Sequence, residues 1–88
     1  MATVIVRHQV GDFDTWLKGH TDRVTVFSPF IKSIKTFRDP GDPNSIAMIL
    51  EVTDMEKMNA IMNDPSVQPY KDKHTVLDPI TVYLEVPV

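Results

Sequence analysis

The segment from Val4 to Phe27 limits the fold more than any other part of the sequence. It begins with an alternating run that predicts a strand, and Gly11 then supplies a turn before Asp12, a good residue to cap the N-terminus of a helix. One face of this strand carries Val4, Val6, His8 and Val10. Residues at helical spacing follow: Phe13, Trp16, Leu17, His20, Val24 and Phe27. We expect one helix whose stripe faces the sheet, with Gly19 as a close backbone contact or a weak point.

The rest of the chain predicts three more strands and two more helical segments. Strands are expected at 31–38, 46–52 and 80–86, and helical segments at 53–63 and from Asp64 to His74. The stretch 39–44 is dense in turn residues, so it closes a hairpin between the second and third strands. Thr53 and Glu56 resemble a capping box at the start of the second helix. The lysines of the second strand are typical of an edge strand, whereas the third strand is apolar on both faces and fits the middle of a sheet.

This order of elements, β-α-β-β-α-β, predicts a ferredoxin-like α+β fold, with one domain over residues 1–88 and a four-stranded antiparallel sheet. Right-handed crossovers place both helices on one face of that sheet. The other face then carries Ile5, Ala47 and Ile49, which lie opposite in parity to the valines of the first strand. An apolar face of that kind is an association site, so we expect a second copy of the chain to cover it.

Composition argues against several classes of partner and chemistry. The net charge is −3 and Lys and Arg do not cluster, which argues against binding to nucleic acid or to an anionic membrane. No apolar run approaches the ~20 residues that span a bilayer, and the first residues do not predict a signal peptide, so we expect a cytoplasmic protein with no membrane partner. Without cysteine there is no disulfide, no thiolate metal site and no cysteine nucleophile. We expect neither a bound metal ion nor a cofactor.

The opening Val10-Gly11-Asp12-Phe13-Asp14-Thr15-Trp16 resembles the dimeric α+β barrel superfamily. It is most similar to small proteins related to the antibiotic biosynthesis monooxygenases and the stress-responsive barrel proteins, and the likeness in length and element order covers the whole chain. The resemblance implies a homodimer whose two sheets pack face to face. It also implies a pocket for a small apolar or aromatic molecule between each sheet and its helices. Members include cofactor-independent oxygenases of polycyclic phenols, lactone isomerases and haem-degrading enzymes, so fold alone does not select a reaction.

The histidines are the main candidates for chemistry, because phosphate-binding glycine loops, H-E-x-x-H and G-x-S-x-G are absent from the sequence. His8 lies on the valine face of the first strand, His20 in the stripe of the first helix, and His74 on a face with Tyr70. Histidine can act as a general base or a metal ligand near neutral pH, although any single one is more often a hydrogen-bonded core or rim residue. We predict His8 and His74 as catalytic residues. The residues predicted to bind the substrate are Trp16, His20, Met58 and Tyr70.

Two classes of function remain open. The first is a cofactor-free oxygenase or isomerase, in which His8 polarises or deprotonates a phenol or an enol. The second is a non-catalytic dimer that binds a ligand or has a structural role. The resemblance to haem-degrading enzymes, whose iron-ligating histidine precedes the final strand, adds haem binding through His74 as a narrower alternative. A cavity that contacts His8 favours the first class, whereas a core filled by Trp16, Phe13 and Phe27 favours the second.

Overall fold

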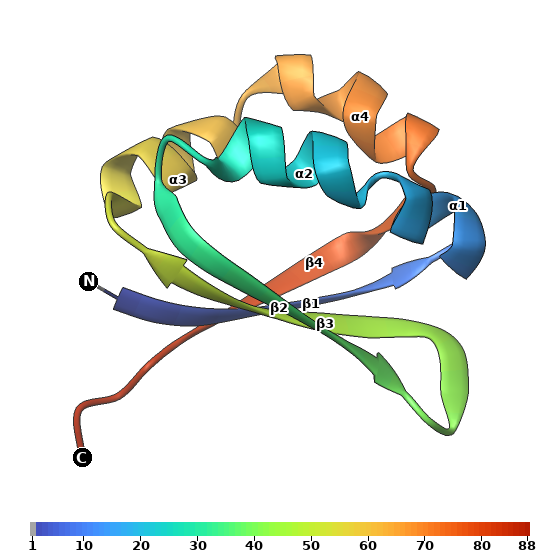
Figure 1. Cartoon of the computed structure of the whole chain (residues 1–88), viewed down its shortest axis with the longest axis horizontal. Helices are drawn as coiled ribbons and strands as arrows, with labels where there is room; N and C mark the ends of the chain where they lie inside the picture. The colour runs from blue at the N-terminus through green and yellow to red at the C-terminus, as the bar shows by residue number, and fades with distance from the viewer. Residues whose placement is uncertain (1) are drawn as a thin grey trace.

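The computed structural model describes residues 2–88 and shows a layer of helices over one face of a four-stranded antiparallel sheet (Figure 1). The strands lie in the order β2-β3-β1-β4, as in the predicted ferredoxin-like arrangement. The elements in chain order are β1 (Ala2–Val10), α1 (Phe13–Lys18), α2 (His20–Phe27), β2 (Ile31–Asp39), β3 (Asp42–Val52), α3 (Met55–Met62), the short 3-10 helix η1 (Pro65–Val67), α4 (Gln68–Lys73) and β4 (Val76–Leu84). No helix within residues 2–88 is long and apolar enough to cross a bilayer.

The face of the sheet that carries the valines of β1 packs against the helices, as the alternation predicts. His8, at 8% exposure, is buried on the same face. Trp16, Phe30 and Met58 complete the core from the helical side, and each of them is 1% exposed. The core residues contributed by the strands are Val4, Val6, Val10, Ile46, Met48, Leu50 and Val52.

The expectation of one continuous first helix is wrong, because the helix is interrupted at Gly19. Gly19 is both the last cap of α1 and the first cap of α2. A Cβ atom placed on Gly19 would lie 2.6 Å from Nε2 of His74 and 2.7 Å from the neighbouring ring carbons. Gly19 therefore both interrupts the helix and makes a close contact with His74, since only a glycine lets the chain pass so near the His74 ring.

The predicted stripe of the first helix is also wrong in part. Leu17 and Val24 are 46% and 42% exposed, and His20 is exposed as well, so these three side chains do not face the sheet. The buried positions are Trp16, Gly19, Arg23 and Phe30. The first three of these positions follow a helical period, so the true inward face is displaced from the one that the apolar residues suggested, and Phe30 lies in the turn after α2. Arg23 takes an inward place that we had not assigned to it.

Several element boundaries also differ from expectation. β3 begins at Asp42 rather than Ile46, so the turn before it is shorter than the stretch 39–44 suggested. The cap of α3 is Asp54 rather than Thr53, because a carboxylate oxygen of Asp54 accepts a hydrogen bond from the backbone N–H of Lys57 at 3.1 Å. The last strand starts at Val76 rather than after Pro79. Its pairing with β1 passes from Gln9↔Leu77 to Arg7↔Thr81, so a bulge of residues 78–80 accommodates the proline.

A threonine joins the two connections at one end of the molecule. The backbone N–H of Gly11 donates to the carbonyl of Thr75 at 2.8 Å. The Thr75 hydroxyl donates to the carbonyl of Asp12 at 3.1 Å and accepts from the Asp12 N–H at the same distance. We call this set of bonds the Thr75 clamp. It fixes the start of α1 against the chain between α4 and β4.

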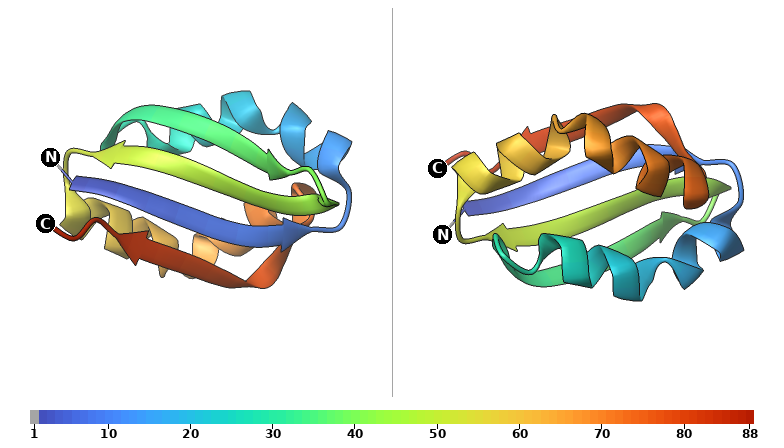
Figure 2. Two further views of the ribbon diagram at one scale, coloured as in Figure 1. Left: turned by 90° about the horizontal axis from the view of Figure 1, so that it is seen from below. Right: turned by 90° about the horizontal axis from the view of Figure 1, so that it is seen from above.

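The opposite face of the sheet is not covered by any helix of the described chain (Figure 2, left). Ile5 lies there between Ile49 on β3 and Tyr83 on β4, and Phe37 of β2 lies beside Ala47. Ile5, Phe37 and Tyr83 are 37%, 49% and 48% exposed. The parity argument from the sequence is therefore confirmed: both faces of this sheet carry apolar side chains.

Candidate functional site

A cavity of about 90 Å³ lies between the sheet and the helices. Most of its wall is apolar. Side chains from β1, β3 and β4 form the wall on the side of the sheet, and every helical segment contributes at least one side chain, with Trp16 coming from α1. Five of the six predicted site residues line it: His8, Trp16, Met58, Tyr70 and His74. The sixth, His20, is exposed and lies outside the lining. The inward face at positions 16, 19 and 23 explains this, since it carries Arg23 toward the cavity and leaves His20 exposed.

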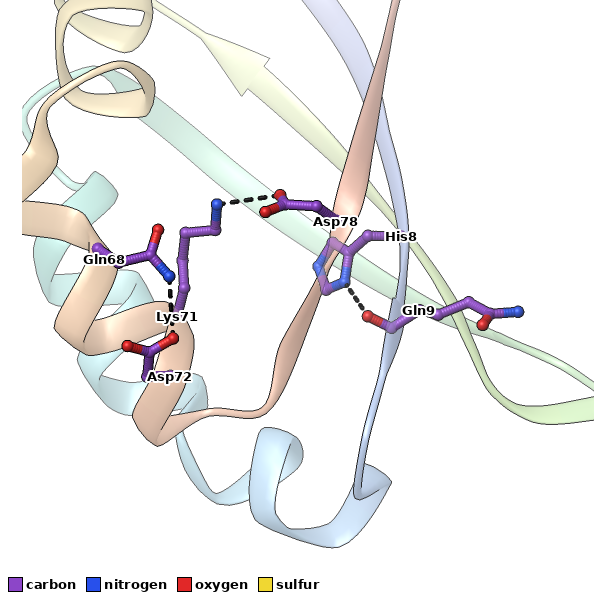
Figure 3. Close-up of polar contacts among 6 residues, drawn as sticks. All are labelled: His8, Gln9, Gln68, Lys71, Asp72 and Asp78. Carbon is purple, nitrogen blue, oxygen red and sulfur yellow. Dashed lines mark hydrogen bonds and ion pairs between the residues drawn. The ribbon is translucent and has the colours of Figure 1, made fainter.

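The geometry of His8 makes it a candidate base. Its Nδ1 lies 3.0 Å from the carbonyl oxygen of Gln9 (Figure 3). A carbonyl only accepts, so Nδ1 carries the proton and Nε2 of the neutral ring has the free lone pair. Burial lowers the pKa of His8 from its usual 6.5; the Gln9 bond opposes this, while the positive charges of Arg23 and Lys71 act with burial. His8 is therefore neutral at pH 7 and able to take a proton at Nε2.

His74 lies at the end of α4, with 6% of its surface exposed. Its Nε2 is buried against Gly19 and lies 3.6 Å from a carboxylate oxygen of Asp22, beyond hydrogen-bonding distance. Burial and the charge of Arg23 lower the pKa of His74 from 6.5, with Asp22 acting in the opposite direction. His74 is therefore a second neutral imidazole in the cavity wall, but a closely packed one.

Sequence reasoning missed Arg23, the most unusual group in the cavity wall. It is only 8% exposed, and one of its terminal nitrogens, Nη2, donates to the carbonyl of Trp16. The guanidinium carbon lies 4.1 Å from the centre of the Trp16 ring, which gives a cation–π contact. Burial lowers the pKa of Arg23 to about 10, so it is still a cation at neutral pH. No local pattern signalled its burial, because the inward face at positions 16, 19 and 23 is visible only in the structure.

Tyr70 and Lys71 of α4 lie where the cavity wall meets solvent. Tyr70 lines the cavity although it is 47% exposed, and its ring centre is 6.5 Å from that of His74. Lys71 also lines the cavity, and its Nζ reaches across to the Asp78 carboxylate on β4 at 3.1 Å (Figure 3). These two side chains form the rim of the cavity on the side of α4.

Over residues 2–88 no three His, Asp or Glu side chains converge on a common point as metal ligands.

The two buried histidines make folding stability dependent on pH. Their folded-state pKa values are lowered, so as the pH falls below 6.5 the unfolded chain binds protons that the folded protein does not. The free energy of unfolding should therefore decrease steadily in that direction and stay nearly constant above it. Urea titrations between about pH 8 and 5 measure this. That pH range excludes the titration of the exposed Asp64, because hydrogen bonds from Ser66 lower the pKa of this carboxyl from 3.8.

Histidine-to-glutamine variants identify the groups responsible. H8Q and H74Q should each flatten the dependence, and the matched control is H20Q, which replaces an exposed imidazole outside the cavity. A free energy of unfolding that is constant across this range in the parent protein would contradict the burial of neutral histidines.

Comparison with known proteins places this fold. No model of a known protein family matches the sequence. No curated protein sequence matches it either. Among solved structures, SnoaB, a cofactor-independent oxygenase from Streptomyces nogalater, matches with a TM-score of 0.73 at 15% identity, over 99% of this chain and 94% of its own. A candidate antibiotic biosynthesis monooxygenase from Bordetella bronchiseptica has a TM-score of 0.76 at 14% identity, with 99% and 96% covered.

A further antibiotic biosynthesis monooxygenase matches with a TM-score of 0.69 at 20% identity, over 100% of this chain and 99% of its own. The chain has the fold of the antibiotic biosynthesis monooxygenases. The resemblance inferred from the first strand and helix is thus confirmed for the fold. The sequence identities are too low to assign the reaction or the substrate of these proteins to this chain. The antibiotic biosynthesis monooxygenase fold places the cavity described above between one sheet and its own helices.

Proposed function

We propose that the chain is a cofactor-independent oxygenase of the antibiotic biosynthesis monooxygenase type, acting on a phenol or an enolisable compound. The observation that carries this proposal is a neutral, buried His8 whose proton-accepting nitrogen is Nε2, in the wall of an apolar cavity. Removal of a proton from a phenol or an enol leaves an electron-rich anion that can react with O₂ without a bound metal. The apolar wall supports such a reaction because it keeps water away from the anion. The match to SnoaB, described as a cofactor-independent oxygenase, supports the same class.

The size of the cavity limits the substrate. Its volume is about 90 Å³, whereas an engineered apolar cavity that binds benzene measures about 150 Å³. A one-ring substrate therefore needs the half-exposed Tyr70 to move aside, and a larger one extends past Tyr70 into solvent. Met58 and Met62 in the wall are flexible enough to adapt to such a ligand.

Oxygen consumption tests the proposal. Chelator-treated protein is mixed with a panel of phenols and 1,3-diketones, and O₂ uptake is followed with an electrode. We expect uptake proportional to protein concentration and insensitive to added chelator. Deuterium exchange at the acidic carbon of the same diketones, measured by NMR under nitrogen, reports proton removal alone. Exchange without O₂ uptake identifies an isomerase-type enzyme; the absence of both contradicts catalysis and favours the non-catalytic alternative.

We also propose that the working form is a homodimer in which the uncovered sheet faces pack together. The support is the apolar surface of Ile5, Phe37, Ala47, Ile49 and Tyr83, which the helices of one chain leave open. Stable interfaces of this kind commonly bury about 2,000 Å² or more in total, which requires most of one sheet face. A dimer of this form leaves each cavity in its own subunit, on the far side of the sheet.

Replacing Ile49 with glutamate is expected to split this dimer. Ile49 is central, since it pairs with Ile5 on β1 and with Lys35 on β2. A carboxylate there would be buried without a partner, so light scattering at micromolar concentration should fall from twice the 10.0 kDa chain mass to that mass, or the chain should unfold. The control A60E adds the same charge at an exposed position of α3 and should stay dimeric. A parent protein that is monomeric and folded would contradict the proposal.

No described feature favours the haem alternative. A haem-ligating histidine presents a free nitrogen to the iron, whereas Nε2 of His74 is enclosed by Gly19 and Asp22. Titration with haemin, followed by absorbance, would show a Soret band that is lost in H74Q if this alternative held.

A further inference from the structure

Arg23 has hydrogen-bonding capacity that the protein does not use. A guanidinium has five N–H donors and no acceptor, and all of them require partners when buried. Nη2 donates to the Trp16 carbonyl, but Nη1 is buried with no hydrogen-bond partner among residues 2–88. Arg23 is also one of the residues that line the cavity. Nη1 is enclosed in this structure, so a molecule in the cavity reaches it once neighbouring side chains shift.

Arg23 also lacks a close ion pair. No carboxylate of the described chain lies within ion-pair distance of it, although the other cation in the cavity wall, Lys71, is paired with Asp78 at 3.1 Å. The charge of the neighbouring Asp22 opposes the lowering of the Arg23 pKa, but its carboxylate lies closer to Lys73 and His74, at 3.7 Å and 3.6 Å. A buried cation without a close partner is unfavourable, so an anion that entered the cavity would be stabilised by pairing with it.

The Trp16 ring places the candidate base and this cation on the same wall. The His8 ring meets Trp16 edge-on with 6.1 Å between ring centres, and the Arg23 guanidinium lies over Trp16 at 4.1 Å. All three line the cavity. A small ligand against Trp16 is then near a group that accepts a proton and near a group that binds the negative charge left behind.

We infer that the substrate is held in the cavity as an oxyanion, with its phenolate or enolate oxygen bound to Nη1 of Arg23. The inference rests on the proposed function and adds to it the charge class of the ligand and a binding residue. In this step the O–H or C–H bond of the substrate breaks, its electron pair stays on the substrate, and the proton passes to Nε2 of His8. Arg23 remains protonated throughout and takes no part in the transfer.

The ionisation of a bound phenol tests the inference without any oxidation. The probe is 4-nitrophenol, whose phenolate is coloured and whose phenol is not. At a pH where the free probe is mostly neutral, binding to the parent protein should increase the phenolate absorbance. It should also be about 10–100-fold tighter than binding of 4-nitroanisole, the methyl ether that cannot ionise, because charge-assisted hydrogen bonds have that strength. Equilibrium dialysis measures both affinities.

Variants assign the effect to Arg23. R23M should lose the absorbance increase and bind the phenol and the ether equally, whereas R23K, which keeps the charge, should retain part of the preference. H8Q should still bind the phenolate, because Arg23 is intact. Circular dichroism establishes that each variant is folded, and the parent titration stands even if R23M is not.

Equal affinity of the parent protein for phenol and ether, or failure of the phenol to bind at millimolar concentration, would overturn the inference. So would an unchanged preference in folded R23M, which would leave Arg23 a purely structural partner of Trp16. The proposed reaction can be contradicted separately. A phenolate signal without O₂ uptake from any substrate would contradict the oxygenase activity and leave the anion-binding site supported.

Discussion

Replacing His8 with glutamine is expected to lower the rate of substrate turnover by ~10²–10⁴-fold. Glutamine approximates the size of the imidazole and stays polar, but it cannot accept a proton at neutral pH. The loss should appear both in O₂ uptake and in deuterium exchange, because both begin with proton removal. Steady-state rates on the best substrate of the phenol and diketone panel provide the measurement.

The pH profile of the parent protein gives an independent check. A base must be unprotonated to act, and burial lowers the pKa of His8 below 6.5, so the rate should stay constant through neutral pH and decrease only on the acidic side of 6.5. H20Q should keep both the rate and the profile, since His20 lies outside the cavity. A folded H8Q protein with parental activity would exclude His8 as the base.

Replacing Trp16 with alanine is expected to lower the free energy of unfolding by about 3–5 kcal/mol. The indole is 1% exposed and lies among the His8, Phe13 and Arg23 side chains. Its removal leaves a void in the core and takes away the ring beneath a buried cation. Urea titration followed by circular dichroism measures the change, since the chain has no second tryptophan for a fluorescence assay.

Leu17→Ala is the matched control for this substitution. Leu17 is adjacent in α1 and 46% exposed, so its truncation should cost less than about 1 kcal/mol. A loss of under about 1 kcal/mol for Trp16→Ala as well would show that the indole does not hold the helices to the sheet.

Alternation in β1 and β3 was enough to predict the two faces of the sheet, because side-chain direction in a strand follows directly from position. The same argument placed His8 in the cavity wall, where its strand neighbours are valines. The capped start of α1 at Asp12 was also readable, since its carboxylate oxygen accepts from the N–H groups of Asp14 and Thr15. Local patterns of this kind need no knowledge of distant contacts.

Arg23 could not be found in this way, because its burial depends on a contact between distant parts of the chain. The His74 ring lies against Gly19, and the helix face that packs there also carries Arg23, four positions further on. Charged residues are almost never fully buried, so a pattern-based reading assigns Arg23 to solvent. The start of β4 was missed for a related reason: Pro79 signalled the end of a turn, but a bulge lets the strand continue through it.

The Thr75 clamp has a consequence for how a ligand reaches the cavity. It joins residues 63 positions apart and secures only the end of α4 next to β4. The preceding segment, η1 and α4, has no buried residue of its own, so local opening of this segment removes none of its own side chains from the core. Amide protons of α4 should then exchange with solvent sooner than those of β1 and β3, on a free-energy scale well below that of global unfolding. Ligand exchange can follow this partial opening, pivoting at Thr75, while the sheet and its hydrogen bonds persist.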